Sequence, residues 1–149
     1  MVRRFYDYWL AVAPAGRLPG RQHIAPEDLV PLLPRLWLGD VYRDPLRIRY
    51  RLAGTEVVWS FGREVTGQWL DEVQPEAFHN ATVYERYRFM VETGRPTWRR
   101  GVSQWQRDPK HRRVENCVVP LAKDGRTVDM LFAVVVLFDY EGNELHRAS

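Results

Sequence analysis

Histidine, cysteine and serine are the side chains whose spacing would support metal binding or nucleophilic catalysis. The chain has four histidines, and no two of them have the i, i+4 spacing with which a helix binds a metal ion. Its one cysteine, Cys117, excludes a CxxC zinc site and a disulfide within the chain. The serines lack a Gly-x-Ser-x-Gly context. We therefore expect no metal, no catalytic residues and no enzyme.

Aromatic and amide side chains form a second group, which would suit a ligand pocket. Such pockets are mostly apolar with a few placed polar groups. Asn80 and Asn116 are predicted on a helix and a strand, and leaving a buried amide unpaired costs about 1–3 kcal/mol. Each buried amide would therefore form hydrogen bonds either with a ligand or with the protein backbone and water, and we favour the backbone and water. The pocket candidates are Trp59, Asn80, Tyr84, Tyr87, Trp98 and Asn116, and the aromatic members suit an apolar core equally well.

A stripe of arginines, Arg47, Arg49 and Arg51, alternates with apolar residues in the clearest strand pattern of the chain. The stripe would meet phosphates in a nucleic-acid binder. Charged side chains also protect the edge of a sheet from pairing with another chain, and we favour this second interpretation.

The amino-acid composition favours one folded domain that needs no disulfide bonds. Of the 149 residues, 45% are apolar and 13% aromatic, which is enough for a core and excludes a disordered chain. The net charge of +3 is weak evidence for nucleic acid. Arg3 and Arg4 precede a short apolar run, but Asp7 interrupts it, and no run approaches the roughly 18 apolar residues of a membrane span. We expect a soluble cytoplasmic protein.

The elements follow from periodicity and from glycine and proline. Apolar residues at helical spacing predict an N-terminal helix that ends at Pro14. A brief helix over 29–33, strands over 36–42 and 47–52, a short helix over 55–61 and a long helix over 75–92 follow. The last third contains strands over 97–107, 113–121 and 128–138, with turns at 108–110 and 123–126.

This order predicts an α+β fold, with an antiparallel sheet and helices on one face. Residues 131–137 are apolar without alternation, which indicates burial on both faces and a central strand. The second face then needs cover, and the N-terminal amphipathic helix can supply it. Its stripe is Phe5, Tyr8, Trp9 and Val12, and we expect these residues to lie at a homodimer interface, where bulky aromatics are enriched.

The same order and several short motifs resemble the PAS domain family over residues 36–139. Residues 61–67 (FGREVTG) carry the Gly, Glu and Gly spacing of the family's middle helix. Residues 92–96 (ETGRP) are similar to the segment before the family's third strand. The family's closing hairpin resembles a later stretch that contains Pro120-Leu121, Asp124-Gly125 and an apolar strand ending at Asp139. Residues 8–34 resemble the lead-in of a bacterial stand-alone PAS subfamily.

The resemblance implies a five-stranded sheet in the order 2-1-5-4-3. It divides the chain into a helical lead-in over 1–35, a PAS-like sensory domain over 36–140 and a tail over 141–149. It implies no cofactor: Cys117 is on a predicted strand and not in the helical Asn-Cys-Arg motif of flavin-binding relatives. His79, where haem-binding relatives use a histidine, is expected to be a solvated residue of a helix first turn.

Three functions remain open at this stage. We favour a stand-alone sensory or signalling module that binds a small molecule or a protein partner, acting as a homodimer or on another signalling protein. The first alternative is a small α+β cavity enzyme, an isomerase or hydrolase in which Tyr84 or Tyr87 would donate a proton; no acid stands on an apolar face to complete it. The second alternative is a weak nucleic-acid binder.

Overall fold

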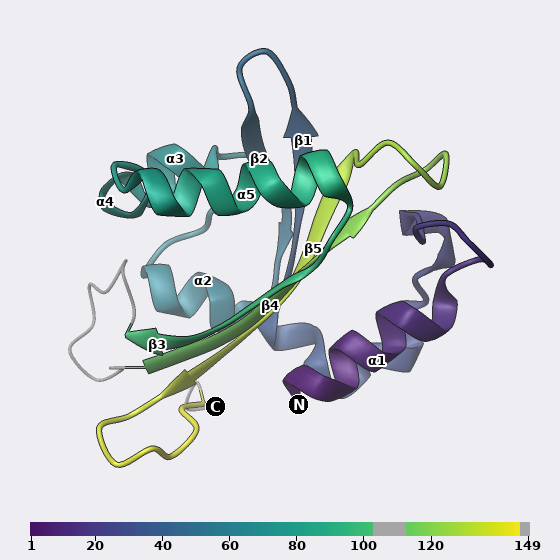
Figure 1. Ribbon diagram of the computed structural model, residues 1–149. Helices are drawn as coiled ribbons and strands as arrows, with labels where there is room; N and C mark the ends of the chain where they lie inside the picture. The colour runs from purple at the N-terminus through teal and green to yellow at the C-terminus, as the bar shows by residue number, and fades with distance from the viewer. Residues whose placement is uncertain (103–112, 147–149) are drawn as a thin grey trace.

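Five antiparallel strands form one sheet, in the order β2-β1-β5-β4-β3, in the computed structural model, which describes residues 1–102 and 113–146 (Figure 1). The strands are β1 (Leu36–Tyr42), β2 (Arg47–Ala53), β3 (Thr97–Val102), β4 (Arg113–Leu121) and β5 (Met130–Phe138). The α+β class and the predicted strand order are both confirmed. The far part of the strand predicted over 97–107, and the turn after it, lie outside the described residues.

The central strand is β5, which pairs with β1 on one side and β4 on the other. Residues 131–134 are buried on both faces of the sheet, as their unbroken apolar run predicts. We call the face that carries Trp37 and Tyr50 the inner face, and the face that carries Leu38 and Phe132 the outer face; each has its own apolar cluster. The protein therefore has two cores that share one sheet.

Four helices cover the inner face (Figure 1): α2 (Thr55–Phe61), α3 (Leu70–Val73), α4 (Pro75–Phe78) and α5 (Ala81–Thr93). The expectation of one long helix over 75–92 is wrong, because the chain breaks at 79–80. Asn80 has an extended backbone, and its Oδ1 accepts a hydrogen bond of 2.9 Å from the backbone N–H of Thr82. A side chain that caps a helix start stabilises that start and ends the helix before it.

The outer face is covered by α1 (Val2–Val12) and by the 3-10 segment η2 (Pro26–Arg35), and a short 3-10 turn, η1 (Arg21–His23), lies between them in the chain. Phe5 is fully buried, and its ring packs edge-on against Phe132 with the centroids 4.8 Å apart. The indole of Trp9 is buried as well and donates a 2.9 Å hydrogen bond to the carbonyl of Pro120 in β4. The amphipathic helix thus covers its own sheet.

This packing bears on the predicted dimer stripe. Phe5 and Trp9 lie in the core of one chain, while Tyr8 and Val12 are half-buried at the edge of α1. The Tyr8 hydroxyl accepts a hydrogen bond from the Ala25 backbone N–H and holds α1 to the segment that follows it. An interface built on this stripe would require α1 to leave its own sheet, so it stays a prediction.

The arginine stripe lies on β2, which is an edge strand as expected. Arg47 forms two hydrogen bonds with Asp71, of 2.9 and 2.8 Å, and lies 4.1 Å from the centre of the Trp69 ring. Arg51 pairs with Asp40 at 3.6 Å. Residues 67–68 also form backbone hydrogen bonds with Tyr50, so part of the β2 edge is already paired within the chain.

Candidate functional site

A small polar cavity lies between the inner face of the sheet and the helices, and we call it the inner cavity. Its volume is about 30 Å³, and its polar lining residues are Tyr50, Ser60, Gln74, Arg86, Tyr87 and Asn116. This volume holds a water molecule or a group of a few heavy atoms. The remaining lining residues are apolar, such as Trp37 and Phe61.

Different elements bring these polar side chains together. Tyr50 comes from β2, where alternation with the arginine stripe turns it to the inner face. Gln74 lies between α3 and α4 and donates a 2.9 Å hydrogen bond to the Tyr50 hydroxyl. Arg86 and Tyr87 are neighbours on α5, and Asn116 projects from β4. The site exists only in the folded chain, because its residues span 67 positions of sequence from Tyr50 to Asn116 counted inclusively.

Burial keeps the two tyrosines of the inner cavity neutral. It raises the pKa of Tyr50 well above its ordinary value, and the nearby Tyr87 adds to the effect. Burial also raises the pKa of Tyr87, although Arg86 and Arg99 oppose it. Both hydroxyls, already protonated at neutral pH, therefore stay protonated further into the alkaline range and are able to donate hydrogen bonds.

Arg99 of β3 lies beside this group. It pairs directly with Asn116 across the β3–β4 ladder, so both side chains are on the inner face. One nitrogen of its guanidinium, Nη2, donates a 2.6 Å hydrogen bond to the carbonyl of Val102. A second nitrogen, Nη1, is buried and has no hydrogen-bond partner within residues 1–102 and 113–146. Burial and the charge of Arg86 both lower the pKa of Arg99.

Two of the predicted pocket residues, Tyr87 and Asn116, line the inner cavity. Tyr84 lines an adjoining pocket of about 150 Å³, which Tyr87 separates from it. Trp59 is half-buried on α2 and is not among the lining residues. Asn80 is exposed at the start of α5 and is not among the lining residues of the inner cavity. The helix break rotates it away from the face that carries Tyr87.

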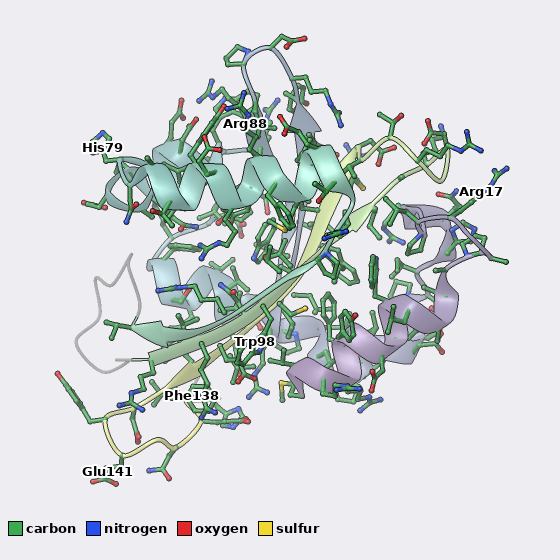
Figure 2. The ribbon with its side chains drawn as sticks, viewed as in Figure 1. Arg17, His79, Arg88, Trp98, Phe138 and Glu141 are labelled. Atoms are coloured by element: carbon green, nitrogen blue, oxygen red, sulfur yellow. The ribbon has the colours of Figure 1, made fainter. Side chains whose placement is uncertain are left out.

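Trp98 is on the other side of the sheet from the inner cavity. Its side chain is 62% exposed and lies on the α1 side of β3 (Figure 2). It lines a groove of about 510 Å³ between α1 and the outer face of β3 and β4, together with Tyr6, Thr97 and the buried Cys117. We call this the outer groove.

His79 is exposed at the junction of α4 and α5 and points away from the sheet (Figure 2). This is the solvated position expected from the sequence. Within the described residues no cluster of three histidine, cysteine or acidic side chains is arranged to hold a metal ion.

Sequence reasoning missed four of the polar residues that the fold brings to this region: Tyr50, Gln74, Arg86 and Arg99. The strict alternation of β2 places Tyr50 opposite the arginine stripe and was the available signal. For Arg99, alternation with Trp98 would have given the face. Nothing local in the sequence identifies Gln74, which reaches the cavity from a connection between two short helices.

The sequence model of the PAS domain family matches residues 1–135 of this chain. The chain belongs to the PAS domain family. Among curated proteins, none matches the sequence.

The match includes α1, so the N-terminal helix is part of the PAS domain as the family describes it. Two of the residues that suggested the family, Gly62 and Glu64, stabilise the local backbone of this PAS domain. Glu64 accepts hydrogen bonds from the backbone N–H groups of Val65 and Thr66, which lowers the pKa of its carboxyl group. Gly62 ends α2 in the left-handed region, with φ of 71°. No helix of the described residues is long and apolar enough to cross a membrane.

Proposed function

We propose that this PAS domain is a sensory module that binds a small ligand in the inner cavity. The observation that supports this most directly is the convergence of hydrogen-bonding groups from β2, β4 and α5 in an otherwise apolar core. Convergent hydrogen-bonding groups are one feature of small-ligand sites, and the volume of about 30 Å³ restricts the ligand, or the part of it that enters, to a few heavy atoms. A ligand shifts such a module by binding one of its conformations more tightly than another.

The composition of the cavity argues against the enzyme alternative. Its lining residues within the described chain include no carboxylate and no imidazole. General acid–base catalysis at neutral pH works best with a group whose pKa lies near that pH. Burial raises the pKa values of Tyr50 and Tyr87, which moves them further above neutral pH. Hydrogen-bond donation to a bound ligand is the chemistry they suit.

The nucleic-acid alternative loses its main support for a different reason. Its candidate stripe is largely committed to partners inside the protein. Arg47 is paired with Asp71, and Arg49 donates a 2.7 Å hydrogen bond to the carbonyl of Gly67. Phosphate contacts would need these guanidinium groups to be free.

A fragment screen by two-dimensional NMR tests the proposal. We expect compounds of three to six heavy atoms to shift the side-chain amide signals of Gln74 and Asn116. Asn116→Leu, which keeps the size of the side chain and removes its polar atoms, should abolish these shifts. Trp98→Ala, on the outer face, is the matched control and should retain them. If no compound shifts either amide signal, the inner cavity is not a ligand site.

The outer groove favours a second role, contact with another copy of the chain. Trp98 and Val102 are 62% and 66% exposed on the outer side of β3, an edge strand. Aromatic anchors of this kind dominate protein interfaces. Trp98→Ser should therefore weaken a homodimer in sedimentation velocity, whereas Phe89→Ser, at an exposed site on α5, should not. A monomer at every wild-type concentration would exclude this role.

A further inference from the structure

The arginines that are not exposed separate into two kinds. Among the described residues there are four of them: Arg35, Arg47, Arg86 and Arg99. Arg35 is paired with Glu56 at 2.8 Å, and Arg47 with Asp71 at 2.8 Å. Arg86 and Arg99 form no ion pair with any described carboxylate. Both of these arginines, which have no counter-charge among the described residues, lie beside the inner cavity.

The two guanidinium groups act on each other and on the same tyrosine. The charge of Arg86 lowers the pKa of Arg99, and both arginines oppose the rise in the pKa of Tyr87. The geometry agrees, because Arg86, Tyr87 and Asn116 line one cavity and Arg99 lies directly opposite Asn116 on the β-ladder. Two like charges at the rim of a core repel each other and lose hydration, which destabilises the protein unless a negative charge lies between them.

The hydrogen-bonding capacity of this region is also unused. Arg99 Nη1 is buried without a partner in the described part of the chain, although buried polar groups nearly always have one. Arg86 forms no hydrogen bond with the residues that the structure describes. Asn116, directly opposite Arg99 on the β-ladder, and the protonated Tyr87 add neutral donors at the same place. Every one of these groups suits an acceptor atom, and the charged ones suit an anion.

We propose that Arg86 and Arg99 bind the anionic group of a small ligand, a carboxylate or an inorganic oxyanion, at the inner cavity. Planar guanidinium groups form paired, charge-assisted hydrogen bonds with such groups. The cavity volume of about 30 Å³ limits the part that enters to a few heavy atoms. This inference rests on the proposed function, because it names the class of ligand for the same cavity.

The test compares two probes that differ in charge and not in shape, formate and formamide, with inorganic phosphate as a third. Binding is followed by NMR on the arginine Nε–Hε signals at constant ionic strength. We expect formate or phosphate to shift the Arg86 and Arg99 signals, and formamide to leave them unchanged. A response to formate alone identifies a carboxylate ligand, and a response to phosphate alone an inorganic oxyanion.

Two variants with matched controls locate the site. Arg86→Gln and Arg99→Gln should each weaken anion binding at least tenfold, since a hydrogen bond to a charged group contributes about that factor. Arg88→Gln removes an exposed arginine from the far side of α5 (Figure 2), and Arg100→Gln one from the outer side of β3. Each control makes the same change in net charge and should keep the affinity.

The outcomes separate the ligand class from the existence of a ligand. If formamide and formate bind equally, or formamide alone binds, the anion inference is wrong and the inner cavity still takes a ligand. If the controls weaken binding as much as the two variants, the anion is held by general surface charge and the inference is wrong. If no probe binds and the fragment screen finds no ligand, both proposals fail together.

Discussion

At the scale of single residues, Arg35 shows how this protein tolerates a buried charge. Its side chain is only 5% exposed, and its Nε donates to Glu56 at 2.8 Å. Glu144, near the C-terminal end of the described chain, lies 3.4 Å from its Nη2. A buried pair contributes modestly as a whole, but losing one member leaves an uncompensated charge. Arg35 thereby ties together η2, α2 and the segment after β5.

We predict that Arg35→Gln lowers the free energy of unfolding by about 3–5 kcal/mol, the usual effect of removing one partner of a buried pair. Arg3→Gln is the matched control, because Arg3 pairs with Asp7 at a fully solvated site and should change the free energy by less than about 1 kcal/mol. Urea denaturation measures both. Equal effects for the two variants would show that Arg35 is not a structural centre.

Cys117 gives a prediction on pH. Burial, with a contribution from Glu115, raises the pKa of its thiol from 9.0 to about 11. The folded state therefore holds the proton more tightly than the unfolded state, and the stability this provides is complete below pH 9 and lost as pH rises towards 11.

The wild type should accordingly lose stability more steeply than Cys117→Ala between pH 9 and 11, with a difference of up to about 1.4 kcal/mol per pH unit. Urea denaturation at several pH values gives both slopes. Ionisation of the tyrosines affects the two proteins alike and cancels in the comparison. Parallel slopes would mean that the thiol ionises as freely in the folded protein as in the unfolded chain.

At the scale of elements, α1 decides whether the outer face of the sheet is covered from within. Phe5→Ala with Trp9→Ala removes two core side chains and the hydrogen bond to Pro120. Substitutions of this kind cost about 3–5 kcal/mol each. We predict a large fall in the thermal midpoint, measured by circular dichroism. A dimer that dissociates while the midpoint stays constant would place α1 at a subunit interface instead.

The sheet was predictable from sequence because its signals are local. Alternation on β2, the unbroken apolar run of β5 and the glycine turn at 123–126 each identify an element and its exposure. The break between α4 and α5 was not predicted, because the apolar spacing runs through it and only the capping role of Asn80 reveals it. The brief helix predicted over 29–33 is instead part of the longer 3-10 segment η2, which continues through Pro34.

The site was less predictable than the sheet for the same physical reason. Tyr87 and Asn116 were found, because each stands out from its element by residue type. The pairing of Arg99 with Asn116 depends on the register of β3 against β4, which no local pattern gives. Trp98 was assigned to the same pocket as Tyr87, although the alternation of β3 puts it on the opposite face from Arg99.

At the scale of the whole molecule, the inner cavity and the outer face are connected through β4. Asn116 faces the cavity, while its neighbours Glu115 and Cys117 line the outer groove. Further along the same strand, the Pro120 carbonyl accepts the hydrogen bond from Trp9 of α1. We therefore expect a change at the cavity that shifts β4 to reach α1 through this hydrogen bond and the packing around it.

If the inner cavity binds a ligand as proposed, we predict that its occupancy is sensed on the outer face. Hydrogen–deuterium exchange with and without saturating formate, or phosphate if that is the probe that binds, tests it directly. We predict that the ligand alters exchange over 113–121 of β4 and over 2–12 of α1 in the wild type. In the Arg99→Gln variant the ligand should leave exchange in both segments unchanged. Exchange that changes only in the helices of the inner face would contradict the claim, since the ligand would then bind without any signal crossing the sheet.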